Sequence, residues 1–450
     1  MENEKNMNPI LSGSNNSRRT FVKNTALISG AALLPTFQMN AMFNVFNDKK
    51  LKIALVGCGG RGTGAAVQAL RADGNVELVA MADAFEDRLK DSLMNISKEM
   101  GDMAKNKVNV KAEHQFVGFD AAQKAMDLAD VVILATPPGF RPHHFEYAVN
   151  NGKHVFMEKP VATDVPGVRK VLAAAEKAKA NKLNVVVGLQ RHYQDNYLAA
   201  IDQLKKDAIG KIVSGQVYWN SAGVWVRERQ PGQTELEYQM RNWYYFNWLC
   251  GDHILEQHIH NIDVANWFVG EYPISAQGMG GRQVRTGKDH GEIFDHHFVE
   301  YTYPSGAVIA SQCRHMPETM SRVSETFQGT KGTISTEGDN ATLKDYSGNT
   351  IFEHRGKDDP NPYQVEHIKL FESIRNGGVI ANAENGAKST MSAIIGRMAT
   401  YSGKVIKWDE AMQSNLALSP DTMTWDSPAP VQPNADGFYT IPTPGKTIVM

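Results

Sequence analysis

The chain has 450 residues, of which 42% are hydrophobic and 21% are charged, and its formal net charge is −2 at pH 7. These values are typical of a globular protein. They argue against a nucleic-acid binder, because no dense stripe of lysine and arginine accompanies them. The three cysteines form no C-x-x-C pair, which excludes a disulfide scaffold. The length predicts two or three domains.

Residues 1–45 are predicted to be an export signal and a linker. Ser17–Lys23 reads SRRTFVK, a twin-arginine pattern, and the modestly apolar stretch Thr25–Leu34 follows it. Because that stretch is too short to anchor the chain in a bilayer, we expect a removable signal and export to the periplasm. No membrane span is expected once the signal is removed. The alternative is an ordinary basic N-terminal helix.

Leu51–Gly64, LKIALVGCGGRGTG, organises the first predicted domain, residues 46–180. Five of its first six residues are apolar, as in a strand buried on both faces of a parallel sheet. Gly57, Gly59 and Gly62 then form G-x-G-x-x-G before a helix-compatible run. Such a loop lets backbone N–H groups approach a pyrophosphate and begins a helix whose positive end faces the phosphates. A simple glycine-rich turn is the alternative.

A second apolar run, Val76–Ala82, ends in Asp83. This acidic residue follows the glycine loop by roughly 20 residues, the spacing at which a carboxylate hydrogen-bonds the ribose 2′-OH and repels a 2′-phosphate. The loop and the acidic residue together predict dinucleotide binding, with NAD favoured over NADP.

Strands predicted at 131–135 and 154–157 continue the strand–helix alternation of a doubly wound parallel sheet, the Rossmann arrangement. Ligands bind at the carboxyl ends of such strands, so the residues after them are expected beside the nicotinamide. Lys159 could donate to a substrate oxygen there, or it could be a solvated lysine at a strand end. The predicted cofactor contacts are Gly57, Gly59, Gly60, Arg61, Gly62, Asp83, Thr136, Pro137, His144, Glu158 and Lys159.

Residues 181–450 are predicted to form a second α/β domain that binds the substrate. Between residue 274 and about residue 343, strand-like stretches separated by Gly/Pro turns predict an open, largely antiparallel sheet. The other expected elements are strands at 184–190 and 211–219, helices at 165–181, 195–208, 364–376 and 387–405, and an extended surface tail at 428–450.

The densest cluster of reactive side chains is Gly251–Trp267, GDHILEQHIHNIDVANW. If this segment is one helix, Glu256, His260 and Asp263 share a face at i, i+4 and i+7. An acid–base site needs an imidazole oriented by a carboxylate, and the segment supplies both. A metal site is disfavoured because H-E-x-x-H is absent, so no metal is expected. A polar helix face that lines a domain cleft is the third interpretation.

Aromatic residues gather between Trp219 and Trp248. Sugars present apolar C–H faces that stack on such rings, and arginines hydrogen-bond hydroxyl or acid groups. Most of these rings are expected in the core, with two or three on the ligand. The predicted substrate contacts are Arg191, Trp225, Arg241, Trp243 and His260.

Four strings resemble the glucose–fructose oxidoreductase, inositol dehydrogenase and rhizopine-catabolism family (Gfo/Idh/MocA) over nearly all of residues 50–410. They are VGCGGRG, ATPPGFRPHHFEYAVNNGKHVFMEKP, GDHILEQHIHNIDVANW and GRMATYSGKVIKWDE. The resemblance implies a Rossmann domain and a C-terminal α/β domain whose open sheet often mediates homo-oligomerisation. It also implies that Lys159 polarises the reacting hydroxyl and that His260 is the general base. Glu256 and Asp263 would be supporting carboxylates, either of which could orient the imidazole.

These observations predict an exported NAD-dependent oxidoreductase that moves a hydride between a sugar or glycoside hydroxyl carbon and a tightly bound cofactor. Export of a folded protein implies that the cofactor is loaded in the cytoplasm. It would then be reoxidised in place by a second carbonyl substrate or an electron acceptor. One alternative is a redox-neutral glycosidase that oxidises C3 transiently and eliminates the aglycone. The other is a non-catalytic cofactor- or sugar-binding protein.

Overall fold

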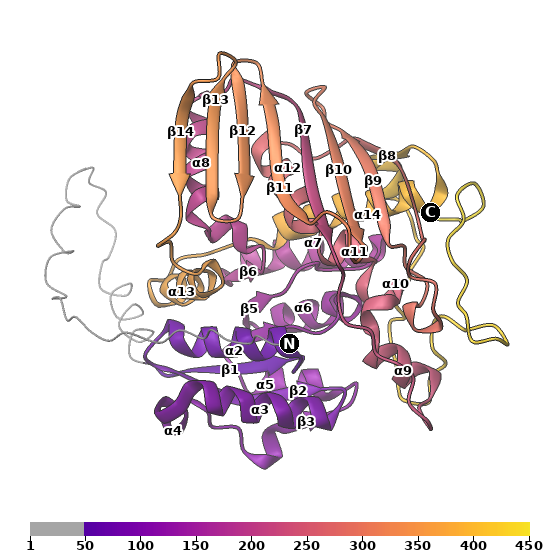
Figure 1. Ribbon diagram of the computed structural model, residues 1–450. Helices are drawn as coiled ribbons and strands as arrows, with labels where there is room; N and C mark the ends of the chain where they lie inside the picture. The colour runs from indigo at the N-terminus through magenta and orange to yellow at the C-terminus, as the bar shows by residue number, and fades with distance from the viewer. Residues whose placement is uncertain (1–48) are drawn as a thin grey trace, which may run out of the picture.

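A six-stranded parallel sheet occupies the first half of the described chain, which covers residues 49–450 of this computed structural model. Its strand order is β3-β2-β1-β4-β5-β6 (Figure 1). The chain therefore reverses its direction of travel across the sheet after β3, and β1 and β4 meet at the switch point where doubly wound sheets bind ligands. The strands are β1 (Leu51–Val56), β2 (Val76–Asp83), β3 (Gln115–Val117), β4 (Val131–Leu134), β5 (His154–Met157) and β6 (Val185–Val187).

Helices cover both faces of the parallel sheet. Alternate residues of β1 enter two different cores: Ile53 and Leu55 pack with α2 and α3, whereas Ala54 and Val56 pack with α5 and α6. The predicted doubly wound α/β fold is confirmed. The helices are α2 (Gly60–Ala72), α3 (Glu86–Met100), α4 (Ala104–Lys107), α5 (Ala121–Asp127), α6 (Arg141–Asn150) and α7 (Val165–Ala180).

Two later segments complete this first domain. β6 pairs with β5, so the parallel sheet extends beyond residue 180, where we expected the domain to end. Helix α13 (Pro362–Arg375) returns from the second half of the chain and packs on α2. Its residues Leu370, Phe371 and Ile374 join the core under β1. The C-terminal half of the chain therefore contributes to the domain that carries the glycine loop.

A nine-stranded sheet forms the second domain, with strand order β14-β13-β12-β11-β7-β10-β9-β8-β15. Only β7 and β10 pair in parallel among its registered neighbours, so the predicted open and largely antiparallel sheet is confirmed. The strands are β7 (Ile212–Ser221), β8 (Ser275–Gly281), β9 (His296–Thr302), β10 (Val308–His315), β11 (Arg322–Gly329), β12 (Gly332–Glu337), β13 (Asn340–Asp345), β14 (Thr350–Arg355) and β15 (Ile406–Lys407).

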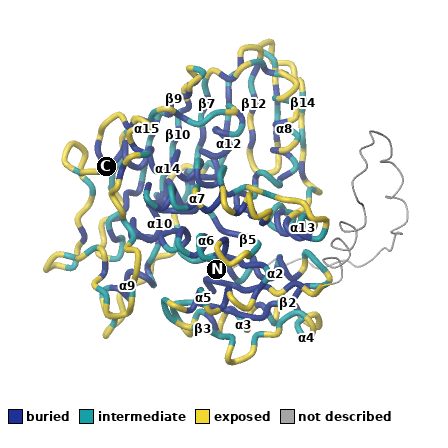
Figure 2. The backbone as a smooth tube through the Cα atoms, turned by 180° about the vertical axis from the view of Figure 1, so that it is seen from behind, coloured by how far each residue is buried: buried dark blue, intermediate teal, exposed yellow. Residues whose placement is uncertain are grey.

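One face of this sheet is covered by α8 (Asp195–Lys205), α12 (Ile259–Val269) and α14 (Ala383–Ser402). Buried and half-buried residues alternate along β9 and β10, as expected when only one face packs on a core. Figure 2 shows α14 as a buried element at the centre of the molecule, and it also packs against α7 of the first domain. The two domains thus share a helical layer.

Short helices and a long tail complete the chain. The helices are α9 (Glu235–Arg241), α10 (Asn247–Cys250), α11 (His253–Glu256) and α15 (Trp408–Ala411). Residues 412–450 contain neither helix nor strand and run along one side of both domains (yellow in Figure 1). Within residues 49–450 no helix is long and apolar enough to cross a membrane. The predicted twin-arginine segment lies outside the described residues.

Candidate active site

A cavity of about 710 Å³ lies between the two domains. The carboxyl ends of the parallel strands form one wall, where sheets of this kind bind ligands. Residues of β7, α9, α11, α12 and α13 form the opposite wall. The residues that line the cavity on both walls include Gly57, Gly59, Gly60, Arg61, Gly62, Asp83, Thr136, Pro137, His144, Glu158, Lys159, Trp219, Trp225, Arg241, Trp243, Tyr244, Glu256, Gln257 and His260.

The glycine loop fits a bound diphosphate. A Cβ on Gly57, whose φ is +95°, would lie 2.5 Å from the backbone nitrogen of Thr136, and a Cβ on Gly62 would lie 2.0 Å from the carbonyl oxygen of Gly57. Gly59 and Gly60 instead face open space. In the described chain, α2 begins with no side-chain cap and no acidic residue in its first turn. Its first N–H groups are therefore available to an anion.

Asp83 ends β2 on the cavity wall. Its Oδ2 accepts a hydrogen bond from the backbone N–H of Cys58 at 2.6 Å, and its Oδ1 accepts one from the N–H of Phe85 at 2.9 Å. Burial raises the pKa of this carboxyl above 3.8, although these two bonds oppose the rise. The side chain thus ties the glycine loop to the end of β2 and still offers lone pairs to a ribose hydroxyl.

Arg61 lies between two buried carboxylates. It forms ion pairs with Glu158 after β5 and with Glu366 of α13, and its guanidinium lies 4.9 Å from the ring centre of Tyr363. Burial alone would lower the pKa of Arg61, but the two carboxylates outweigh that effect and raise it above its usual range. Arg61 therefore links the glycine loop to the strand that precedes Lys159 and to a helix from the second half of the chain.

Thr136 and His144 meet at the same end of the sheet. Thr136 Oγ1 lies 3.2 Å from His144 Nδ1, and burial lowers the pKa of His144 to about 3, so its ring is neutral. Arg141, which is buried, donates to the carbonyl oxygens of Thr136 and Pro160. It holds together the chain segments after β4 and β5, and no local sequence pattern indicated this role.

Lys159 and Glu256 form an ion pair across the domain boundary. Lys159 Nζ lies 2.9 Å from Glu256 Oε2 and also donates to the backbone carbonyl of Glu256. Their side chains are 12% and 9% exposed, so the pair is nearly shielded from water. Burial raises the pKa of Glu256 above 4.5, while the charge of Lys159 opposes that rise.

His260 lies in the same cavity beside the ring of Trp219, with the ring centres 5.9 Å apart. It is buried, and its Nδ1 has no hydrogen-bond partner within residues 49–450. Burial lowers its pKa well below 6.5, and the charges of Lys159 and Arg191 lower it further. The imidazole is therefore neutral at physiological pH and able to accept a proton.

The segment predicted as one helix is two. Gly251 and Asp252 both have positive φ, +76° and +74°, α11 ends at Glu256, and α12 begins at Ile259. Asp263 accepts hydrogen bonds from Ser389 and Asn385 and pairs with His192 at 2.7 Å; it does not line the cavity. Within residues 49–450 neither carboxylate hydrogen-bonds His260, so the orientation of its imidazole by Asp263 or Glu256 stays a prediction.

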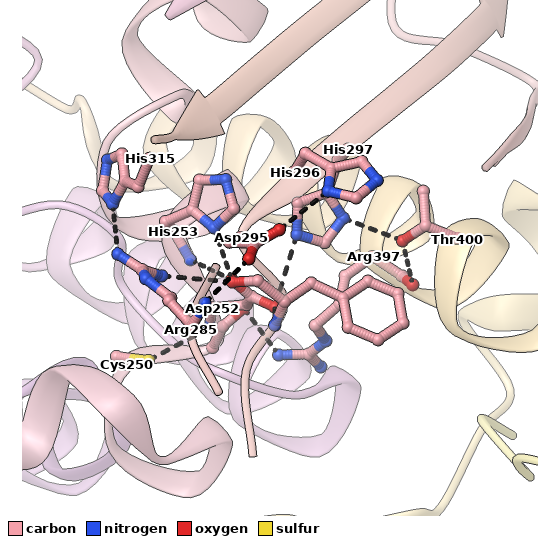
Figure 3. Close-up of polar contacts among 12 residues, drawn as sticks. Cys250, Asp252, His253, Arg285, Asp295, His296, His297, His315, Arg397 and Thr400 are labelled. Carbon is pink, nitrogen blue, oxygen red and sulfur yellow. Dashed lines mark hydrogen bonds and ion pairs between the residues drawn. The ribbon is translucent and has the colours of Figure 1, made fainter. Parts of the chain in front are cut away.

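A buried network anchors the start of α11 (Figure 3). This helix carries Glu256 into the cavity. Asp252 Oδ1 lies 2.7 Å from His253 Nδ1, and Oδ2 lies 3.3 Å from His297 Nε2. Oδ2 also accepts hydrogen bonds from the backbone N–H of Phe294 and the hydroxyl of Tyr401. One carboxylate oxygen of Asp252 and one ring nitrogen each of His253 and His297, the atoms that could bind a metal ion, lie within 4.8 Å of one another. Because Asp252 already accepts several hydrogen bonds, we interpret the cluster as a structural network.

On the substrate side of the cavity, Trp225 and Trp243 line the wall with their ring centres 5.9 Å apart. Arg241, a predicted substrate contact, also lines the cavity, but its guanidinium pairs with Asp87 and Glu237 and lies over the ring of Phe85 instead. Arg191 does not line the cavity: it is buried in an ion pair with Glu325 of β11, so the structure does not bring it to the wall where its contact with substrate was predicted. Trp219, Tyr244 and Gln257 are lining residues that we did not predict.

Two family models together match most of the described chain. The model for an oxidoreductase family with an NAD-binding Rossmann fold matches residues 51–189, and the model for its C-terminal alpha/beta domain matches residues 201–398. The chain belongs to the Gfo/Idh/MocA oxidoreductase family. Its first domain is accordingly an NAD-binding Rossmann domain, which agrees with the glycine loop, the uncapped α2 and Asp83.

Curated relatives in this family match over part of their length. A 2,7-anhydro-N-acetylneuraminate hydratase of Escherichia coli is 27% identical over 203 residues, which is 45% of this chain and 50% of that protein. An inositol 2-dehydrogenase of Rhizobium meliloti is 26% identical over 35% of this chain and 41% of that enzyme. The alignments thus span about half the length of these relatives or less.

Solved structures share the fold at low identity. An aldose-aldose oxidoreductase from Caulobacter crescentus, complexed with glycerol, has a TM-score of 0.62 and 18% identity, covering 80% of this chain and 100% of that one. A scyllo-inositol dehydrogenase from Lactobacillus casei, with bound NAD(H) and scyllo-inositol, has a TM-score of 0.60 and 21% identity, again covering 80% and 100%. Both therefore support the Gfo/Idh/MocA two-domain fold of this chain.

Proposed function

We propose that this protein is an NAD-dependent oxidoreductase that moves a hydride between a hydroxyl-bearing carbon of a sugar or glycoside and a tightly bound cofactor. The observation that carries the proposal is the meeting of Lys159, Glu256 and His260 in the cavity that the glycine loop also lines. One cavity thereby holds both a dinucleotide cradle and an acid–base group.

The protein residues handle the proton and the charge on oxygen. NAD, when bound, supplies the acceptor for the hydride that leaves the hydroxyl-bearing carbon. His260 takes the hydroxyl proton on its neutral ring, so the alcohol loses a hydride and a proton and becomes a carbonyl. Lys159 stabilises the negative charge that develops on the substrate oxygen, and Glu256 fixes the position of the Lys159 ammonium group.

The substrate wall supports a sugar or glycoside. Trp219, Trp225 and Trp243 offer ring faces to the C–H faces of a pyranose, and Gln257 offers an amide to its hydroxyls. The names of family relatives, an inositol dehydrogenase and a sialic-acid derivative hydratase, also point to polyhydroxylated ring substrates.

The proposal includes export and a cofactor that stays bound. The twin-arginine string Ser17–Lys23 favours export of a folded protein, for which the Rossmann domain would be filled beforehand. A cofactor that does not exchange must be reoxidised in place by a second carbonyl substrate or an electron acceptor. Turnover would then follow ping-pong kinetics.

A redox-neutral reaction is the second candidate. The relative named as a hydratase adds water across a bond, a net change without oxidation. A transient oxidation at C3 of a glycoside, elimination of the aglycone, addition of water to the resulting unsaturated ketone and return of the hydride would use the same residues. This candidate predicts free sugar from an aryl glycoside without accumulation of NADH.

A substrate panel tests the proposal. Mono- and disaccharides and aryl glycosides are added to the purified protein while the absorbance of the reduced nicotinamide and the released aglycone are followed. Reduction of the nicotinamide by a sugar supports the dehydrogenase, whereas release of the aglycone without net reduction of the nicotinamide supports the redox-neutral candidate. Ligand binding with neither signal across the panel would favour a non-catalytic binding protein.

A further inference from the structure

Trp425, in the C-terminal tail, packs against two rings at the cofactor cavity. Its ring centre lies 5.3 Å from that of Phe85 and 4.8 Å from that of Phe119. Phe85 and Phe119 both line the cavity, and Phe85 follows Asp83 by two residues. Because Asp83 marks the ribose of the adenosine half, these rings form the wall at the adenosine end.

Phe85 is held from a second side by Arg241. The guanidinium of Arg241 lies 4.0 Å from the centre of the Phe85 ring and forms an ion pair with Asp87 of α3. Phe85 thus packs between a cation of α9 and the ring of Trp425. Both partners come from the second half of the chain, whereas Phe85 itself belongs to the Rossmann domain.

The tail is attached to both domains along its route. We call residues 413–450 the strap. On the first domain, Asp164 Oδ2 accepts a hydrogen bond from the N–H of Leu418 at 2.7 Å. On the second, Gln239 donates to the carbonyl of Val431 at 2.6 Å, and Tyr439 donates to Glu235 at 2.6 Å.

Apolar side chains of the strap also enter a core at this end of the cavity. Leu418, Met423 and Val431 pack in the same cluster as Phe85 and Phe119. Trp425 itself remains 38% exposed, so it covers the two rings from the solvent side. The strap therefore closes the adenosine end from outside, between the anchor at Asp164 and the anchor at Gln239.

We propose that Trp425 is a positioning residue for the cofactor: it holds Phe85 and Phe119 against the adenosine half of the dinucleotide and slows its release. The inference rests on the proposed function in one respect, that NAD binds this cavity. It adds the segment responsible for retention. Differences in affinity at one site are expressed mainly in the dissociation rate, so the strap should change release more than capture.

Dissociation of NADH tests the proposal directly. Protein loaded with NADH is mixed with a large excess of NAD, and the loss of protein-bound NADH fluorescence is followed. Each aromatic pair is worth up to about tenfold in an equilibrium constant, so we expect Trp425→Ala to release NADH about tenfold faster. Trp425→Phe retains a ring and should restore slow release. The NAD recovered per chain after purification without added nucleotide should fall in Trp425→Ala alone.

Phe438→Ala is the matched control. Phe438 lies in the strap, is 41% exposed and contacts Lys288 rather than the cavity wall. The Phe438→Ala variant should release NADH at the same rate as the unmutated protein. Equal release rates for Trp425→Ala and the unmutated protein, with unchanged urea midpoints, would overturn the role of the strap while leaving NAD binding established. Failure of the unmutated protein to bind NADH would overturn the proposed function and, with it, this inference.

Discussion

Buried charges form the walls where Lys159, Glu256 and His260 meet, whereas aromatic rings form the walls beyond Asp83. At the first end the ion pair of Lys159 and Glu256 joins the two domains with little access to water. At the second end the rings pack at tilted angles under a segment that is itself partly exposed. The two ends of one cavity are thus built by different kinds of contact.

We therefore expect the charged end to control the chemical step and the aromatic end to control how long the cofactor stays bound. Charges in a dry environment act strongly on one another, and removing one partner leaves the other without compensation. Substitutions at the charged end should therefore affect the chemical step. Aromatic contacts are weaker and nearly independent of charge. Substitutions at the aromatic end should change how long the cofactor stays bound and leave the chemical step intact.

The largest expected effect is at His260. His260→Ala should lower kcat/KM by about 10²–10⁴-fold, because a general base contributes that much. A base acts only when deprotonated, and burial holds the pKa of His260 well below 6.5. The unmutated enzyme should therefore have constant kcat/KM near neutrality and lose it only as the pH falls below 6.5. An acid limb centred above 6.5 would contradict this assignment. His354→Ala, on β14 and outside the cavity, is the control.

Lys159→Ala should lower kcat by about 10²–10³-fold, the loss typical of one donor to a developing oxyanion. The NADH dissociation rate should stay within about twofold, since the adenosine-end contacts are intact. Lys177→Ala, exposed on α7, should leave both quantities unchanged. If Lys159→Ala released NADH much faster and kept its kcat, the division between the two ends would be wrong.

The sequence predicted the segments whose function depends on local pattern. The run from β1 through the glycine loop to α2 was predicted because its apolar run, glycine spacing and helix start are contiguous. The ends of β4 and β5 were placed by the same logic. These segments contain nearly all of the predicted cofactor contacts that line the cavity.

Contacts between distant segments could not be predicted. Arg191 has the residue type of a sugar ligand, and its burial against Glu325 depends on a strand more than a hundred residues later. The start of α11 depends on its N-cap Asp252, which contacts Phe294 and His297 more than thirty residues later. The sequence predicted an extended surface tail at 428–450, and nothing local indicated that Trp425, just before it, would meet Phe85.

Asp252→Asn tests whether the network behind the charged end positions it. Burial raises the pKa of Asp252, but His297 and His253 outweigh that effect and hold it well below 3.8. A lowered pKa stabilises the folded state above 3.8, and that contribution is lost as the pH falls through the folded-state value. Asp252→Asn should cost about 3 kcal/mol in urea unfolding at neutral pH and less in acid. Asp120→Asn, fully exposed on the surface, is the control; equal midpoints would contradict the role of the network.

The smallest expected effect is on the choice of cofactor at the aromatic end. Asp83 accepts hydrogen bonds from the N–H groups of Cys58 and Phe85 on its two oxygens, so Asp83→Asn keeps one of the two acceptors while removing the charge. A charge-assisted hydrogen bond to the ribose 2′-OH is worth about 1.5 kcal/mol or more, so NAD should bind roughly tenfold more weakly. Loss of the repulsion, with Arg88 on the same wall, should let NADP bind better than before.

Titration of the two nucleotides by quenching of tryptophan fluorescence measures both affinities in each variant. The argument requires the ratio of the two dissociation constants to change, since loss of the charge acts only on the group at the 2′ position. Weakening of NAD and NADP by the same factor would mean that Asp83 acts through the loop at Cys58 and not on the ribose. Tighter binding of NADP than NAD by the unmutated protein would contradict the assignment of Asp83 outright. In either case Trp425→Ala would still test the aromatic wall separately, because it leaves the Asp83 carboxylate and its hydrogen bonds from Cys58 and Phe85 in place.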